Sequence, residues 1–424
     1  MKRYVCLFLV FILTASMPGC GLGIDPPPDI DYENSQKEAA PDKETDAGME
    51  ADTDTEAGTE TQTSGESAPP PDNADSPQQD ETILPEDGIT PPEEDEESVI
   101  VEGVTPPPPT FGFVDAHADT ISRALLPQHD AGLFRNNLHV DFERLLEFGT
   151  PVQVFALWLS DRFLDDAFER TNYMIDFFER EIERHSDIIA IALTLEDLVY
   201  NAENGKISAI LSIEGGEALV GRLENVDHFF NRGVRIMSLT WNRENELGFG
   251  QATGSSEGLK PFGKEVVKRM EELGMIIDIS HINEAGFWDI HNLSARPYMA
   301  SHSNAFAVTP HRRNLTDRQI TAMVERGGII GLVLFPQFLI RNNNNNVSMD
   351  DIFAHINHFI ELGAGGHLGL GGDLDGFRDM PAGLECVLSY KILAERIAER
   401  FDDETSLRIM SVNFYEFFVR YFDG

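Results

Sequence analysis

Basic residues and cysteines are scarce in this chain of 424 residues. It carries 32 Lys and Arg against 73 Asp and Glu, which gives a formal net charge of −41. This excess of negative charge repels phosphate groups, so it argues against nucleic acids and anionic membrane surfaces as partners. Of the three cysteines, Cys6 and Cys20 lie near the N-terminus. Only Cys386 is left for the folded part, which excludes a disulfide within that part.

The apolar run at the N-terminus is too short for a permanent membrane-spanning helix. Residues 1–20 join a basic start, an apolar run over 4–14 and a small-residue exit that ends in Cys20. This order is typical of a signal peptide, and a cysteine at its end resembles a bacterial lipobox. Met17 and Pro18 are unusual there, so simple secretion stays open. We predict a lipoprotein that is lipidated at Cys20 and anchored outside the cytoplasm, in the bacterial cell envelope, on the periplasmic side or at the surface.

Residues 21–109 lack the side chains that a hydrophobic core needs. They hold 26 Asp and Glu, 2 Lys and a single aromatic residue, Tyr32, and they are rich in proline. Their net charge of −24 is more than half of the charge of the whole chain. Without apolar surface to bury, the segment does not offset the entropy lost on folding. We therefore predict a disordered acidic linker, extended by its own repulsion, that tethers the folded domain.

Residues 110–424 show apolar segments that alternate with helical stretches. The predicted strands, rich in Val, Ile and Leu as in buried parallel sheets, cover 113–115, 152–157, 207–213, 234–239, 275–279, 298–301, 329–334 and 368–371. The predicted helices include 167–185, 259–273, 316–326, 349–362 and 389–400. Eight strands with helical crossovers fit an α/β fold of the (β/α)8 TIM-like barrel type. A doubly wound open sheet is the alternative, but no Gly-x-Gly-x-x-Gly follows the first strand to indicate a dinucleotide site.

Metal-binding side chains follow several of these predicted strands. His117 and Asp119 close the first strand, and residues i and i+2 of an extended chain point to the same side. Glu214, followed by two glycines, ends the third strand, where a carboxylate can bridge two metal ions. Later strands end in further groups of the same kind: His281, His302 and Asp373. Because the carboxyl ends of barrel strands meet on one face, these residues predict two adjacent metal sites that share Glu214.

Six motifs, in this order along the chain, resemble those of the membrane (renal) dipeptidase family of zinc peptidases. They are His117-Ala-Asp119, Ser212-Ile-Glu214-Gly-Gly, Asp278-Ile-Ser-His281, Ser301-His302-Ser303-Asn304-Ala305, Arg312-Arg313-Asn314-Leu315-Thr316-Asp317 and Gly371-Gly372-Asp373-Leu374-Asp375-Gly376. Together they extend over nearly all of residues 111–424. The resemblance implies a barrel of the metal-dependent hydrolase (amidohydrolase-like) group that binds two zinc ions per chain.

The same resemblance implies roles for the matched residues. The zinc ligands would be His117 and Asp119 for one ion, His281 and His302 for the other, and Glu214 as the bridge between them. Asp373 would take the proton of the water between the metals, and Arg313 would bind the C-terminal carboxylate of the substrate. The implied reaction is hydrolysis of a peptide bond by a hydroxide that bridges the two zinc ions, with Glu214 and Asp373 as the catalytic carboxylates.

Trp241 departs from the family pattern. The renal-type enzymes have a histidine, thought to polarise the substrate carbonyl, in a segment that here reads Leu239-Thr240-Trp241-Asn242. Indole donates one hydrogen bond, but it neither acts as a base nor carries charge. We expect Trp241 to line the substrate pocket and change the choice of substrate, with Asn242 or Asn245 as a replacement donor. Ordinary packing at the barrel rim is the equal alternative for Trp241.

These observations predict a zinc-dependent dipeptidase. Its substrates would be short peptides with a free C-terminal carboxylate, including peptides with a D-residue at that position. Because Trp241 stands in place of the family's histidine, a different activity on the same scaffold is an alternative. The protein would then hydrolyse another amide or a lactone, for instance an N-acyl amino acid. A surface protein that binds without catalysis is the third alternative, and the intact ligand set argues against it. The expected partners are the small substrate and, through the lipid anchor only, a membrane; a homodimer is compatible with the sequence.

Overall fold

A computed structural model describes residues 111–126, 129, 132–341 and 346–422 of the chain. The signal peptide predicted for residues 1–20, with its lipidation site Cys20, lies outside the described residues. The acidic linker predicted for residues 21–109 lies outside them as well. Among the helices of the described part, none is long and apolar enough to cross a membrane.

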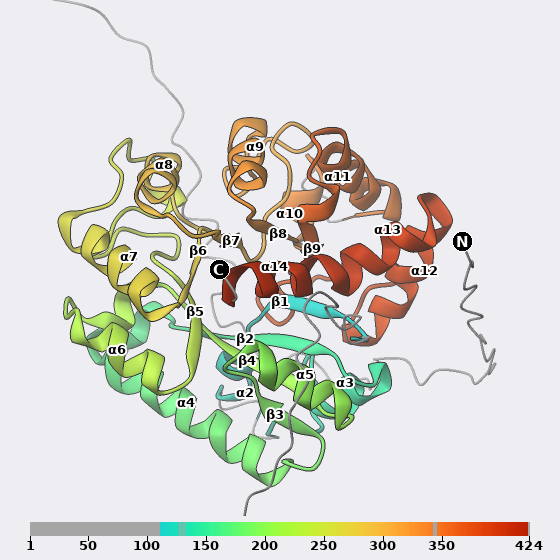
Figure 1. Cartoon of the computed structure of the whole chain (residues 1–424), viewed down its shortest axis with the longest axis horizontal. Coiled ribbons are helices and arrows are strands. Elements are labelled where there is room, and N and C mark those ends of the chain that lie inside the picture. Colours follow the sequence, from blue (N-terminus) through green and yellow to red (C-terminus); the bar gives the residue numbers. More distant parts are fainter. Residues whose placement is uncertain (1–110, 127–128, 130–131, 342–345, 423–424) are drawn as a thin grey trace, which may run out of the picture. The chain divides into compact units, whose positions relative to one another are not determined.

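Eight parallel strands of the described chain close into a barrel (Figure 1). These strands are β1 (Val114–Ala118), β2 (Val152–Trp158), β4 (Ile207–Glu214), β5 (Val234–Ser238), β6 (Ile276–Asp278), β7 (Met299–Ala300), β8 (Ile329–Leu332) and β9 (Leu368–Leu370). β1 pairs with β2 on one side and with β9 on the other, and β2 pairs with β4, so the ring is complete. The predicted (β/α)8 barrel is therefore confirmed, and the open sheet is excluded.

A further short strand, β3 (Ile189–Ile191), was not predicted. It pairs with the first residues of β4, Ile207–Ala209. From Leu211 onward, the same edge of β4 pairs with β5 instead. Three residues between two helices give too short an apolar pattern to be distinguished from a loop. The strand extends one edge of the barrel at the amino end of β4 without interrupting the ring.

Helices connect the strands and follow the last one. The five predicted helices are found as α4 (Ala167–Arg184), α7 (Pro261–Leu273), α9 (Asp317–Glu325), α11 (Met349–Glu361) and α12 (Tyr390–Arg400). The structure adds α2 (Thr120–Ala124), α3 (Phe142–Leu145), α5 (Leu195–Glu203), α6 (Glu224–Asn231), α8 (Glu284–Leu293), α10 (Pro336–Leu339), α13 (Asp403–Leu407) and α14 (Asn413–Phe422). Most of these additional helices have fewer than ten residues, so their periodicity is weak.

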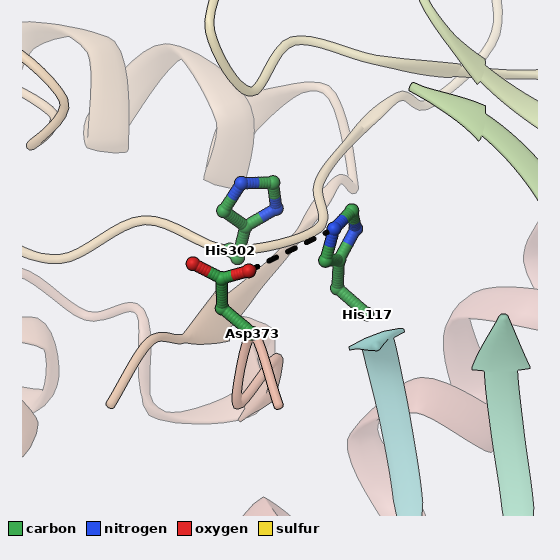
Figure 2. Close-up of side chains that lie close together, drawn as sticks. All are labelled: His117, His302 and Asp373. Carbon is green, nitrogen blue, oxygen red and sulfur yellow. Dashed lines mark ion pairs between the residues drawn. The ribbon is translucent and has the colours of Figure 1, made fainter. Parts of the chain in front are cut away.

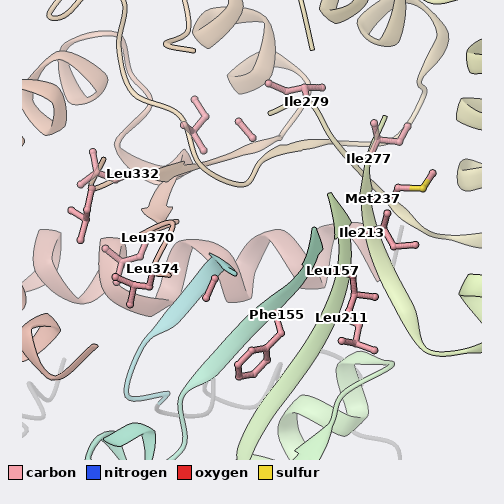
Figure 3. Close-up of a cluster of buried hydrophobic side chains, with 14 of the residues drawn as sticks. Phe155, Leu157, Leu211, Ile213, Met237, Ile277, Ile279, Leu332, Leu370 and Leu374 are labelled. Carbon is pink, nitrogen blue, oxygen red and sulfur yellow. The ribbon is translucent and has the colours of Figure 1, made fainter. Parts of the chain in front are cut away.

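Alternate residues of the strands pack in two different layers. Leu211 and Ile213 of β4 belong to the large core between the strands and the surrounding helices, part of which Figure 3 shows. Ile210 of the same strand belongs to a second core inside the barrel. Because side chains alternate along a strand, Glu214 shares the inward side of Ile210 and reaches the barrel interior at its carboxyl end.

Helix α14 closes the opposite, amino end of the barrel (Figure 1). Its buried aromatic residues, Phe414, Phe417, Phe418 and Tyr421, pack against inward-facing strand residues. The Tyr421 hydroxyl donates a hydrogen bond of 2.8 Å to the carbonyl of Met275, directly before β6. Gly369 of β9 makes room for this helix, because a Cβ there would lie 2.3 Å from the Phe414 ring.

Candidate metal centre

The predicted ligand residues meet at the carboxyl ends of the strands. Three overlapping groups of His, Asp and Glu have ligand atoms within 4.8 Å of one another, and all of these residues are buried. The groups are His117, Asp119 and Glu214; Glu214, His281 and His302; and His117, His302 and Asp373. Figure 2 shows the third group, with His117 at the end of β1 and Asp373 facing its ring. Residues separated by more than 250 positions in the sequence are thus brought into one cluster.

Glu214 lies between two sets of histidines. Its Oε2 atom is 3.5 Å from Nε2 of His117, whereas its Oε1 atom is 2.8 Å from Nε2 of His281. The same Oε1 is 3.7 Å from Nε2 of His302. Each carboxylate oxygen therefore faces a different candidate site, which is the arrangement that a bridging ligand requires.

Two aspartates complete the cluster around His117. Nε2 of His117 is 4.0 Å from Oδ2 of Asp119 and 3.9 Å from Oδ1 of Asp373. The ring centroids of His117 and His302 are 4.0 Å apart. Nε2 of His117 thus lies within 4.0 Å of three carboxylate groups, those of Asp119, Glu214 and Asp373.

Hydrogen bonds from outside the cluster orient two of the histidines. Nδ1 of His281 lies 2.9 Å from Oδ1 of Asn242. Ser301 donates its hydroxyl hydrogen to Oδ2 of Asp278 over 2.6 Å and lies 2.8 Å from Nδ1 of His302. Since that hydroxyl hydrogen is used, Ser301 accepts from Nδ1–H of His302. Bonds of this kind leave Nε2 free to bind a metal.

Of the two asparagines that the sequence suggested as replacement donors, Asn245 uses its NH2 group within its own loop region. The Asn242 side-chain oxygen accepts from Gln251 and faces His281. Asn245 donates to the Leu239 carbonyl and accepts from two backbone amides of its own loop. Asn245 is therefore a turn-forming residue, and Asn242 supports a histidine. The support roles of Asn242 and Ser301 escaped sequence reasoning, because neither residue is a metal-ligand type.

Burial shifts the pKa values of five side chains in the cluster. It raises the pKa of Glu214 to about 8 and the pKa of Asp373 to about 7. Burial, followed by the nearby Glu214 carboxylate, raises the pKa of Asp119 well above its usual range. The pKa values of His281 and His302 are lowered well below their usual range by burial, so both rings are neutral at pH 7. The positive charge of Arg313 lowers the pKa values of Glu214 and Asp373, but burial outweighs it and both stay raised.

The cluster also contains buried polar atoms that the described residues leave unsatisfied. Nε2 of His117, Oδ1 of Asp119 and Oε2 of Glu214 have no hydrogen-bond partner within the described part of the chain. Buried polar atoms are rarely left in this state. Imidazole nitrogens and carboxylate oxygens are ligands that zinc accepts. The residues present therefore fit a divalent metal, on both sides of Glu214.

Left-handed backbone conformations position two members of the cluster. His281 has a φ of 71° and Asp373 a φ of 57°, which is uncommon for residues other than glycine. Gly376 allows the close approach around Asp373. A Cβ at this position would lie 2.1 Å from Oδ1 of Asp373 and 2.8 Å from Oδ2 of Asp119. The turn that follows β9 is thus built to bring both aspartates together.

Arg313 and Trp241 lie beside the cluster. Arg313 is 5% exposed, and its guanidinium donates over 3.2 Å to the carbonyl of His302. Burial lowers its pKa to about 10, so it remains a cation at neutral pH. The Trp241 ring packs edge-on against Trp158 at 5.3 Å and lies 6.1 Å from the ring of His281. The indole therefore stands next to a predicted metal ligand.

A cavity of about 250 Å³ adjoins the cluster. His281 and Arg313 line it, together with Gln251 and Ser303, which sequence reasoning did not single out as functional. Ser303 follows His302 directly and belongs to the motif Ser301-His302-Ser303-Asn304-Ala305, whereas Gln251 lies in the long connection between β5 and α7, outside the six motifs. The cavity gives a small molecule access to the metal-binding cluster.

Comparisons with known proteins show which family the chain resembles. The family model for membrane dipeptidase (peptidase family M19) matches residues 109–417. The dipeptidase aclJ of Aspergillus oryzae is 32% identical over 276 residues, which cover 62% of this chain and 64% of that relative's length, so less than two thirds of the relative is spanned.

Two solved structures share the fold. The dipeptidase AC, a metallopeptidase, has a TM-score of 0.68 at 26% identity, covering 74% of this chain and 100% of its own. A metallopeptidase from Rhodobacter sphaeroides, solved with a phosphinate mimic of the dipeptide L-Ala-D-Ala, has a TM-score of 0.67 at 25% identity, covering 73% of this chain and 99% of its own. With a family model matched over most of its length, the chain belongs to the membrane dipeptidase family, peptidase family M19.

Proposed function

We propose that this protein is a metal-dependent dipeptidase that binds two zinc ions. The observation that carries the proposal is the position of Glu214, whose two oxygens face His117 on one side and His281 with His302 on the other. Membership of a metallopeptidase family supports the same reading. One ion would be held by His117, Asp119 and Glu214, and the second by Glu214, His281 and His302.

When bound, zinc supplies Lewis acidity toward the scissile carbonyl and acidifies water at neutral pH. Proton transfer and substrate binding would be carried out by side chains of the protein. Asp373 lies 3.9 Å from His117, and burial raises its pKa in the metal-free protein. We expect it to take the proton of the attacking water and deliver it to the leaving amine.

Arg313 is the proposed receptor for the substrate carboxylate. It is a buried cation on the wall of the cavity, and a guanidinium binds a carboxylate through two parallel hydrogen bonds. A buried positive charge on the wall of a small cavity selects substrates that end near the scissile bond. Such a cavity favours dipeptides over long peptides and proteins.

A C-terminal D-residue belongs to the proposal as well, because the Rhodobacter sphaeroides relative was solved with a mimic of L-Ala-D-Ala. The second candidate function is hydrolysis of another amide, such as an N-acyl amino acid, or of a lactone. Trp241 favours it, since the aromatic pair with Trp158 stands beside His281 where renal-type enzymes carry a histidine.

A substrate panel tests the two candidates against each other. The zinc-supplemented protein would be offered L,L-dipeptides, L,D-dipeptides, N-acyl amino acids and lactones, with metal content measured on the same sample. Preferred cleavage of dipeptides supports the first proposal, and preferred cleavage of N-acyl amino acids or lactones replaces it by the second. A protein that holds two zinc ions but cleaves none of them would be the non-catalytic binding protein.

We also propose that the protein is anchored in the bacterial cell envelope through Cys20, with residues 21–109 as the tether. The support is the signal-like order of the first twenty residues and the acidic composition that follows. The Cys20→Ala variant should take up no labelled fatty acid, whereas the wild type should take it up. If the wild type itself stays unlabelled, simple secretion replaces the anchor.

A further inference from the structure

Three residues that line the cavity beside the metal-binding cluster each have a buried polar atom that no described residue satisfies. These atoms are Nε of Arg313, Oγ of Ser303 and Oε1 of Gln251, and all three residues line the cavity. Arg313 and Ser303 are only 5% and 1% exposed. Because buried polar groups are nearly always paired, a ligand in the cavity is the natural partner for them.

The orientation of the Gln251 amide follows from the tautomer of His281. For Nε2 of His281 to face Glu214 as a ligand atom, Nδ1 must carry the hydrogen and donate it to Oδ1 of Asn242, 2.9 Å away. The same Asn242 oxygen accepts from Nε2 of Gln251 over 2.6 Å. Gln251, which lines the cavity, therefore turns its NH2 group toward Asn242, and its carbonyl oxygen is the side-chain atom left without a partner among the described residues.

The cavity thus offers two kinds of hydrogen-bonding group. Gln251 contributes an oxygen that only accepts, and Arg313 contributes N–H groups that only donate and carry a positive charge. Ser303 can do either. The volume of about 250 Å³ is below the ~300–1,000 Å³ of pockets for drug-sized ligands, so one amino-acid residue is a better fit than a longer peptide.

We propose that Gln251 is a specificity-determining residue that accepts a hydrogen bond from the main-chain N–H of the substrate residue whose carboxylate binds Arg313. Both groups belong to one α-amino-acid residue and are separated by a single carbon atom, so one small cavity holds both. This inference rests on the proposed function and adds which part of the substrate is recognised. It requires a hydrogen on that nitrogen, so residues with an alkylated nitrogen bind poorly.

A pair of probes that differ only in this hydrogen tests the inference. The full-length, zinc-loaded protein would be titrated by calorimetry with N-acetyl-alanine and with N-acetyl-N-methylalanine of the same chirality. The wild type should prefer the first probe by about tenfold, the size of one hydrogen bond that leaves a buried acceptor unpaired when lost. Gln251→Leu should bind N-acetyl-alanine as weakly as the methylated probe and bind the methylated probe like the wild type.

The control is Gln337→Leu, the same substitution at an exposed position of α10 outside the cavity, which should keep the tenfold preference. Zinc content is measured on every variant. If Gln251→Leu loses zinc and its affinity for both probes falls equally, Gln251 acts through Asn242 and His281, and the proposal is overturned. A wild type that cleaves dipeptides but does not distinguish the probes also overturns it. A wild type that binds neither probe and cleaves no dipeptide would instead remove the proposed function.

Discussion

The Nε2 atoms of His281 and His302 lie 2.9 Å apart, and their supporting hydrogen bonds turn both lone pairs toward one another. Asn242 accepts from Nδ1 of the first ring, and Ser301 accepts from Nδ1 of the second. Neither Nε2 then carries a hydrogen, so the two acceptors face each other and also face Glu214. A cation bound between these three residues would resolve that repulsion.

Glu214→Gln should lower zinc occupancy and abolish turnover while the barrel stays folded. The amide keeps the shape of the side chain, but it replaces one of the two oxygens that face the histidines with an NH2 group. Metal analysis, circular dichroism and dipeptide hydrolysis on one preparation measure the three effects. Full activity with the wild-type zinc content would remove Glu214 from the bridging position.

Arg313→Ala should raise KM much more than it lowers kcat, because the substrate carboxylate keeps its charge throughout the reaction. The loss of kcat/KM should correspond to about 2–5 kcal/mol, as for a buried charge pair with one partner removed. Steady-state kinetics on one good dipeptide measure it, with Arg318→Ala on the exposed side of α9 as the matched control. An unchanged KM would place carboxylate recognition elsewhere.

Asp373→Asn should lower kcat by a factor on the order of 10²–10⁴, with KM and zinc content close to those of the wild type. The amide preserves the size of the side chain, but it cannot take up and release the proton that the carboxyl group exchanges. The same kinetic assay, run beside metal analysis, separates this effect from metal loss. A loss of zinc in proportion to activity would make Asp373 a ligand rather than a proton carrier.

Trp241→His should change substrate preference more than metal content. The indole lies 6.1 Å from the His281 ring, so a new imidazole there would stand beside a predicted ligand without displacing it. Relative kcat/KM for dipeptides and N-acyl amino acids is the measurement. Trp288→His, the same change on α8, serves as the control. If both variants show the wild-type preference, Trp241 packs the rim and does not select substrates.

The free energy of unfolding should fall in mild acid because of His355. This buried histidine of α11 accepts from the amide of Ala305 over 3.1 Å, and its Nε2 lies 3.2 Å from the Leu339 carbonyl, to which it donates. Burial lowers its pKa to about 4 in the folded protein, against an ordinary value of about 6.5 in the unfolded chain. The unfolded state therefore binds the extra proton between pH 6.5 and 4, and stability falls with pH in that window.

The expected loss from His355 is about 3 kcal/mol between pH 7 and pH 4, corresponding to about one proton taken up on unfolding. Urea unfolding at several pH values measures the slope. His355→Gln should be less stable at pH 7 but show a shallower pH dependence below 6.5. A variant with the wild-type slope would show that other groups cause the acid sensitivity.

Much of the site could be predicted because residues at the carboxyl ends of barrel strands lie on one face of the fold, wherever they stand in the sequence. Glu214 illustrates this, since alternation from Ile210 places its side chain inward at the carboxyl end of β4. Gln251 illustrates the opposite case. It lies in an irregular connection, its neighbours have no periodic pattern, and its role depends on a hydrogen bond to Asn242 that only the folded structure reveals.

Backbone conformation was the second feature of the site that the sequence could not predict. His281 and Asp373 could be identified as ligand-type residues at strand ends, but their positive φ angles could not, because neither is a glycine. The contribution of Gly376, which lets Asp373 and Asp119 approach, likewise depends on a steric contact rather than on a pattern. The short strand β3 was missed for lack of length, as were most of the additional helices.

The position of α14 has a consequence for how the protein is made. The ring closes between β1 and β9, and the barrel interior is covered by a helix synthesised later still. The Phe111 ring, before β1, lies 5.5 Å from that of Tyr415 in α14. A nascent chain without α14 therefore leaves the apolar interior of its barrel uncovered, whatever strands have already formed. Sealing of the barrel waits for α14 to leave the ribosome, so folding of the barrel during synthesis stays incomplete until that moment.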